Sequence, residues 1–184
     1  MTYPPAFPHL ADKDLNPLGL DSEFFEGKKK RINHEFNLDD YSGRMVVKIV
    51  LTDDSILTLS DISIDQGGLS YRIYTAAQVA ESGTFADSAT VYSNNILSYA
   101  PTVPSTWTFT IGGDVALNVG VTTADAVAKT RLRSASSNSA RSSVLSTASS
   151  PRGYPAGTYY AVFEELSGVN TSTTGVWIME WTQL

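Results

Sequence analysis

Short segments in which apolar and polar residues alternate run through this chain from residue 44 almost to its end. The alternation is found at 45–51, 56–64, 70–75, 89–93, 105–111, 115–119 and 126–133. Because successive side chains of a strand point to opposite faces, a period of two predicts β-strands with one buried face. Glycine, proline and aspartate separate the segments and mark turns. The pattern predicts an all-β fold, an antiparallel β-sandwich or jelly roll.

The first two segments are predicted to form a β-hairpin. They are separated by Asp53, Asp54 and Ser55, which are typical turn residues. In the second arm, Leu57 and Leu59 fall out of step with the isoleucines that follow them, and the shift at Asp61 indicates a bulge or bend.

A second hairpin is predicted at the C-terminal end, from segments 157–166 and 174–182. Both segments carry large side chains on both faces. Such surface is unfavourable in water, at about 25 cal/mol per Å², so we expect it in the middle of a sandwich or at a subunit interface. Tyr160, Trp177 and Trp181 are the residues expected in the core or in a trimer interface.

Two stretches lack the alternation. Residues 1–32, with four prolines, predict an extended N-terminal arm whose anchors would be Tyr3, Phe7 and Leu10, although a floppy tail is the alternative. The serine-rich stretch 134–150 predicts a long exposed loop within the sandwich domain 33–184.

Two shorter stretches are interpreted locally. The basic run 28–31 is expected to be a solvated loop before a strand around 34–38. Residues 76–83 are the best helix candidate, or else an irregular connection.

Composition narrows the function classes. A chain of 184 residues has room for one domain with a core. Its net charge of −6 argues against binding to a nucleic-acid backbone, and the lack of cysteine excludes disulfides and thiolate metal sites. The sequence shows neither a signal peptide nor a membrane-spanning apolar run, so we expect a protein made in a cytoplasm with no membrane partner.

No set of residues indicates catalysis. His9 and His34 lack a second histidine at metal-ligand spacing, and no Gly-x-Ser-x-Gly elbow, phosphate loop or dinucleotide motif is present. Acidic pairs such as Asp53–Asp54 fit turns better than a calcium loop, and a glycosidase pair stays open because its spacing depends on the fold. We expect no enzyme, no cofactor and no metal site.

One resemblance covers residues 70–184. The run Tyr71–Thr84, a strand ending at Ser93–Asn95, the threonine-rich strand Thr106–Thr110, the run Tyr154–Tyr160 and the apolar C-terminal segments together resemble small accessory virion proteins of tailed bacteriophages, which include capsid decoration, or cement, proteins. The resemblance implies a trimeric jelly roll of the tumour-necrosis-factor type. It also implies a position outside the shell, bridging neighbouring major capsid subunits.

These observations predict a structural virion protein on the capsid surface, with the major capsid protein and two further copies of itself as partners. Tyr3, Phe7 and Leu10 would contact the shell. One alternative is a head-fibre or tail adaptor that touches another virion protein or the host surface. An alternative of another class is a carbohydrate-binding jelly-roll module that uses Trp107, although the alternation around Trp107 favours the core for this side chain.

Overall fold

The computed structural model describes residues 26–94, 103–133, 152–166 and 172–184 and shows an all-β fold with antiparallel sheets, as predicted. Sheet A has the strand order β11 (Arg152–Tyr154), β3 (Ser55–Gln66), β13 (Thr174–Gln183), β1 (Lys29–Asn37) and β7 (Val91–Ser93). Sheet B has the order β10 (Ala128–Arg133), β4 (Gly68–Thr75), β12 (Gly157–Glu165), β2 (Arg44–Leu51), β8 (Trp107–Ile111) and β6 (Asp87–Ser88). A two-stranded ribbon joins β5 (Val79–Ser82) to β9 (Asp114–Leu117). The predicted arm anchors and the serine-rich stretch lie outside the described residues.

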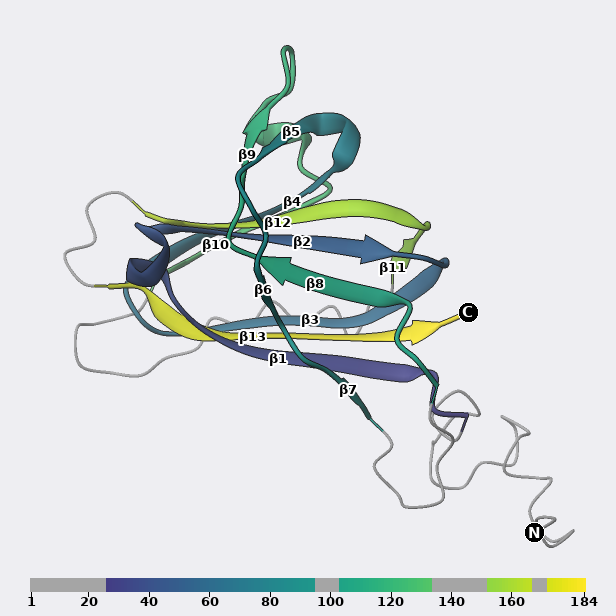
Figure 1. Cartoon of the computed structure of the whole chain (residues 1–184). Coiled ribbons are helices and arrows are strands. Elements are labelled where there is room, and N and C mark those ends of the chain that lie inside the picture. Colours follow the sequence, from purple (N-terminus) through teal and green to yellow (C-terminus); the bar gives the residue numbers. More distant parts are fainter. Residues whose placement is uncertain (1–25, 95–102, 134–151, 167–171) are drawn as a thin grey trace, which may run out of the picture.

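The two large sheets stack face to face and enclose an aromatic core (Figure 1). Phe163 of β12 meets Trp177 of β13 across the interior, with ring centroids 5.1 Å apart. Near the other end of β13, Trp107 of β8 stacks on Trp181 at 4.8 Å. Large rings from both sheets therefore fill the space between them, and the sandwich predicted from the alternation is confirmed.

Both predicted hairpins are wrong. Strand β2 pairs with β12 and β8 in sheet B, whereas β3 pairs with β13 and β11 in sheet A. The same separation holds at the C-terminal end, where β12 lies in sheet B and β13 in sheet A. Three extended residues span about 10 Å, the distance between stacked sheets, so the turn at 52–54 is long enough to change sheets. Each crossing lets both strands turn an apolar face to the shared interior.

The bulge predicted at Asp61 is also misplaced. The register between β13 and β3 shifts between Glu180 and Trp181, where no residue of β13 lies opposite Thr58, and again between Thr174 and Gly175. The first shift turns Ser60 inward and leaves Leu59 half-buried, contrary to the expected order. At the second shift a side chain on Gly175 would overlap the backbone of β3, so glycine permits the close approach of the two strands.

The basic run does not form a solvated loop, because β1 starts at Lys29 and includes Lys29, Lys30 and Arg31. Lys30 is buried, and its ammonium group donates to the carbonyl of Val103 at 2.5 Å. Burial lowers the pKa of Lys30. Strand β1 begins before the predicted start at His34 because it pairs with β13 from Lys29 onward, and Lys30 faces inward because it alternates in step with the buried Ile32.

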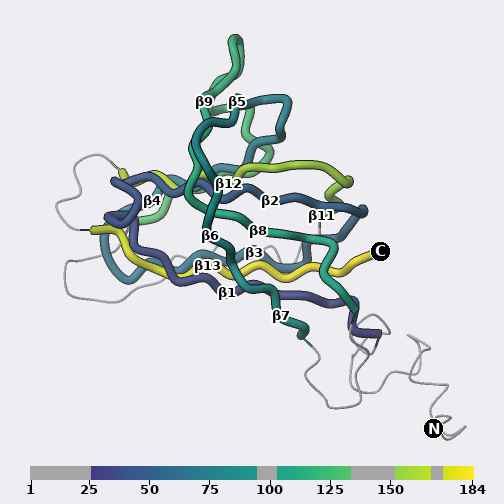
Figure 2. Tube along the Cα trace, in the orientation of Figure 1, coloured from purple at the N-terminus to yellow at the C-terminus, as the bar shows by residue number. Residues whose placement is uncertain are grey.

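The 3-10 turn η3 (Leu38–Tyr41) connects β1 to β2, and a long excursion between β4 and β10 contains the strands β5 to β9. The excursion begins with the 3-10 turn η4 (Ala76–Gln78) in place of the possible helix, and η5 (Thr123–Asp125) precedes β10. Strand β6 pairs with β8 in sheet B and β7 pairs with β1 in sheet A, so residues 87–93 run across one open side of the sandwich from sheet to sheet (Figure 2). The excursion therefore closes this edge as well as forming the β5–β9 ribbon.

Candidate functional site

The two tryptophans predicted for the core or a trimer interface belong to the core of this chain. Trp177 and Trp181 are fully buried between the sheets, and Trp107 is only 1% exposed. The interpretation that Trp107 faces the core is confirmed, and this side chain is not available as a sugar-binding platform. None of the three rings can contribute to an interface between copies without opening the sandwich.

Tyr160 lies on the opposite, outer face of β12. It packs in a second apolar cluster that joins sheet B to the β5–β9 ribbon (Figure 1). The buried members of this cluster are Val46, Tyr74, Val79, Val115, Tyr160 and Val162. The apolar residues on both faces of β12 are thus explained by one face toward the interior and one face under the ribbon.

A polar group fastens the ribbon to the sheet beside this cluster. The carboxylate of Glu81 on β5 accepts hydrogen bonds from the Tyr160 hydroxyl at 2.5 Å and from the Lys48 ammonium group at 2.7 Å. These two hydrogen bonds lower the pKa of Glu81, whereas burial and the nearby carboxylate raise the pKa of Tyr160 to about 12. A tyrosine that holds its proton so firmly is a hydrogen-bond donor rather than a base, so the arrangement serves attachment.

The outer face of sheet A has no cover among the described residues. Its centre carries Val176 and Ile178 of β13, which are half-buried, and Leu59 of β3, in the same condition. Charges of both signs surround them, including Arg31 of β1, which lies 3.5 Å from the carboxylate of Glu180. This face combines apolar and charged groups, as protein contact surfaces do.

Asp61 occupies an unusual position on this face. It lies opposite Ile178 in the register of β3 and β13. One of its carboxylate oxygens is buried and has no hydrogen-bond partner, and burial raises its pKa. A carboxylate in this condition costs stability when it is ionised.

A hollow of about 270 Å³ opens at one side of the sandwich, opposite the side that residues 87–93 cross. Its floor includes the buried Ser60 and Tyr71, and its rim includes Lys129, Arg152 and Tyr154. Burial strongly raises the pKa of Tyr71, so its hydroxyl stays protonated. The hollow is therefore a mostly apolar pocket, lined also by Leu57, Ile73 and Val127, to which Ser60, Tyr71, Lys129 and Arg152 add polar groups.

Among the residues that sequence reasoning tested for catalysis, His34, Glu164 and Glu165 have separate surroundings in the described part of the chain. His34 lies on β1 opposite Trp177, and burial lowers its pKa, whereas His9 lies outside the described residues. Glu164 pairs with Arg72 at 2.9 Å, and Glu165 accepts a hydrogen bond from Thr173. Within residues 26–94, 103–133, 152–166 and 172–184, no group of three or more histidine, aspartate or glutamate side chains is placed to hold a metal ion.

No helix in the described part of the chain is long and apolar enough to cross a membrane. Comparison with known proteins found no match to any family model, to any curated protein or to any solved structure. The case for a function therefore depends on the geometry of this chain alone.

Proposed function

We propose that this protein is a structural virion protein that decorates a phage capsid and cements it by bridging major capsid subunits. The observation that carries the proposal is the strand order. The excursion between β4 and β10 contributes β5, β6, β7, β8 and β9. Without these strands, sheet A has the order β11-β3-β13-β1 and sheet B has the order β10-β4-β12-β2. Eight strands that alternate between two sheets in this way support a jelly roll, an architecture that recurs in viral capsid domains.

The outer face of sheet A is the surface that we assign to contact with further copies of this chain. Val176, Ile178 and Leu59 give it an apolar centre. The chain as a whole carries a net charge of −6, so copies repel one another, but Arg31 supplies a positive group on this face beside Glu180. A face with both signs can complement charges on a neighbouring copy, and trimer formation would multiply each contact with the shell.

The arm anchors Tyr3, Phe7 and Leu10, which lie outside the described residues, remain the residues that we propose for contact with the major capsid protein. The first described residues lead directly into β1, next to the open face of sheet A. An arm that starts at this point can reach a neighbouring subunit while the sandwich stays folded.

The first test is the mass of the purified protein by light scattering, followed by sedimentation with capsids of the encoding phage from which this gene has been deleted. We expect a trimer that sediments with the capsids. Ile178→Glu should convert the trimer to a monomer, because it replaces an apolar contact residue of sheet A with a carboxylate directly opposite Asp61. Thr108→Glu is the matched control, since Thr108 is an exposed strand residue on the other sheet.

Removal of residues 1–25 separates the two proposed contacts. The truncated chain should keep the mass of the trimer and lose sedimentation with capsids. A protein that is monomeric and stays in the supernatant in its full-length form contradicts the proposal. Equal loss of trimer in both glutamate variants would contradict the assignment to sheet A.

A further inference from the structure

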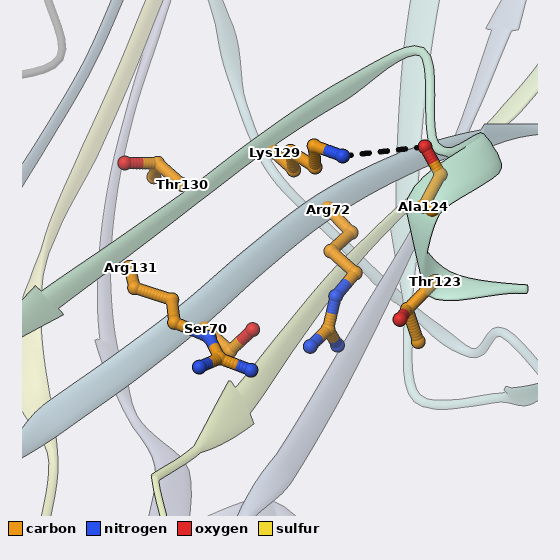
Figure 3. Close-up of a pocket in the computed structure, with 7 residues that line it drawn as sticks. All are labelled: Ser70, Arg72, Thr123, Ala124, Lys129, Thr130 and Arg131. Carbon is orange, nitrogen blue, oxygen red and sulfur yellow. Dashed lines mark hydrogen bonds between the residues drawn. The ribbon is translucent and has the colours of Figure 1, made fainter.

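A second, basic hollow lies on the outer face of sheet B, over strands β4 and β10. It has a volume of about 370 Å³ and is lined by Ser70, Arg72, Thr123, Ala124, Lys129, Thr130 and Arg131 (Figure 3). Three of these side chains are cationic and none is acidic. In a chain with a net charge of −6, this concentration of positive charge is local and calls for a physical reason.

The cationic groups are brought together by the pairing of β10 with β4. Lys129 lies directly opposite Arg72 in the register, and Arg131 lies opposite Ser70. Like charges in directly opposite positions destabilise a sheet. Local arrangements that work against stability are concentrated at functional sites, so the opposed cations favour a bound counter-charge.

Arg72 is already held in position for such a ligand. One of its terminal nitrogens contacts Glu164 at 2.9 Å, and its side chain is only 12% exposed. A guanidinium group has five N–H donors, so this contact leaves others available. Lys129 donates to the carbonyl of Ala124 at 3.3 Å, which turns its ammonium group toward η5.

Arg131 is the least engaged of the three. Its side chain is exposed, and it forms no hydrogen bond or ion pair with another residue in the described part of the chain. In Figure 3 its guanidinium group lies on the same side of the strand pair as that of Arg72, with the Ser70 side chain between them and Thr123 beyond Arg72. Two guanidinium groups and two hydroxyls therefore border one space.

We propose that this hollow binds the oxyanion group of a small acidic ligand, a carboxylate, sulfate or phosphate, between Arg72 and Arg131. Guanidinium groups match the geometry of these oxyanions through paired hydrogen bonds. The volume lies near the lower end of the range for ligand pockets, which suits a compact ligand such as a sugar acid or free phosphate. Ser70 and Thr123 add hydroxyls that can bind the neutral polar groups of a sugar.

A purely structural role would account for only part of this arrangement. Lysine and arginine on an edge strand prevent it from pairing with other chains, and β10 is at the edge of sheet B. This role suits Lys129, Arg131 and Arg133. It does not apply to Arg72, because β4 has no free edge, and Arg72 instead forms an ion pair with Glu164 of the neighbouring strand β12 at 2.9 Å. Neither of these roles requires Lys129 to lie directly opposite Arg72.

The test is a calorimetric and NMR titration of the full chain with sodium phosphate, sodium sulfate, glucuronate and N-acetylneuraminate, with glucose as the neutral control. We expect saturable binding of at least one of the anions, with shifted amide signals in β4, η5 and β10. Arg131→Gln should weaken binding about tenfold or more, as expected for loss of a hydrogen bond to a charged group. Arg133→Gln removes the same charge from the same face outside the hollow and should change binding less than about threefold.

The pattern of ligands identifies the source of the oxyanion. Binding of phosphate or sulfate alone supports a site for a free anion, and preference for glucuronate or N-acetylneuraminate supports a site for an acidic sugar. Equal weakening by Arg131→Gln and Arg133→Gln would show diffuse attraction and overturn the proposal. Absence of saturable binding by all four anions would overturn it as well. These results are independent of whether the protein binds a capsid.

Discussion

The outer faces of the two sheets differ although the strands that form them have similar patterns. On sheet B, Tyr160 and Val162 alternate with interior residues and are buried under the β5–β9 ribbon. On sheet A, Val176 and Ile178 also alternate with interior residues but remain half-buried, with no covering element among the described residues. The difference lies in the excursion between β4 and β10, which folds back over one sheet only.

An apolar residue on an outer face can therefore serve either the folding of one chain or the contact between chains. An apolar residue on β12 contributes to the folding of a single chain, because its cover comes from the same chain. The outer-face apolar residues of β13, Val176 and Ile178, contribute little until another molecule covers them. Substitutions in the shared interior, under the ribbon and on the open face should therefore affect the free energy of unfolding in that descending order.

The largest expected effect comes from Phe163→Ala in the shared interior. Phe163 is fully buried, and its ring lies 5.5 Å from that of Phe36 and 4.9 Å from that of Tyr71. Loss of a core aromatic ring removes buried surface and leaves a cavity, so we expect the free energy of unfolding to fall by about 3–5 kcal/mol. Denaturant unfolding measures the change. Thr158→Ala, on the outer side of the same strand, should cost less than about 1 kcal/mol.

A smaller effect is expected from Tyr160→Phe, which keeps the ring under the ribbon and removes the hydroxyl that donates to Glu81. The expected loss is about 1 kcal/mol. Hydrogen exchange should become faster in β5 and β9 and stay unchanged in β13, since the hydrogen bond fastens only the ribbon. Tyr92→Phe, at an exposed tyrosine on the edge of sheet A, is the matched control. Faster exchange throughout both sheets would contradict a local role.

The same contact gives the ribbon a pH dependence. Because hydrogen bonds from Lys48 and Tyr160 lower the pKa of Glu81 in the folded protein, its contribution is present above the unfolded pKa of a glutamate. The contribution is lost as the pH falls through the lowered pKa. Acidification should therefore speed hydrogen exchange in β5 and β9 in the parent chain and have less effect in Tyr160→Phe.

Much of the strand content could be predicted from the sequence, because alternation is a local property. Strands β2, β4, β8 and β10 lie where the alternation placed them, with ends that differ by a few residues. The partner of each strand could not be predicted this way. A turn of two acidic residues and a serine favours a hairpin locally, but the interior on which both strands pack is formed by residues far away in the sequence. The crossing between sheets was therefore missed twice.

The candidate sites were missed for the same reason. Arg72 and Arg131 belong to different segments, and only the pairing of β4 with β10 brings them to one hollow. The alternation of Lys129, Arg131 and Arg133 on one strand was the signal available in the sequence. Without the strand order, nothing linked this basic strand to Arg72. By contrast, the core position of Trp107 could be predicted from its alternation with Thr106 and Thr108, whereas for Trp177 and Trp181 the sequence left the core and a trimer interface as alternatives.

The smallest expected effect, and the sharpest test of the open face, comes from Asp61→Asn. Burial raises the pKa of Asp61 in the folded chain, so the folded state binds a proton more tightly than the unfolded state does. The parent chain is therefore most stable below the unfolded pKa of an aspartate and loses this contribution as the pH rises through the folded pKa. Asparagine has no charge to bury, and at neutral pH we expect a gain of about 0.5 kcal/mol in the free energy of unfolding that disappears in acid.

Measuring the gain from Asp61→Asn at several protein concentrations tests whether further copies cover the outer face of sheet A. If further copies cover sheet A, they also cover Asp61, which lies opposite Ile178. The unpaired oxygen is then removed further from water, and the gain from Asp61→Asn should be larger in concentrated solutions, where the trimer forms, than in dilute ones. Thermal unfolding at neutral and acid pH over a range of concentrations measures both dependences. A gain that does not change with concentration would mean that sheet A stays open to solvent in the assembled protein, and the contact between copies would then have to use another surface.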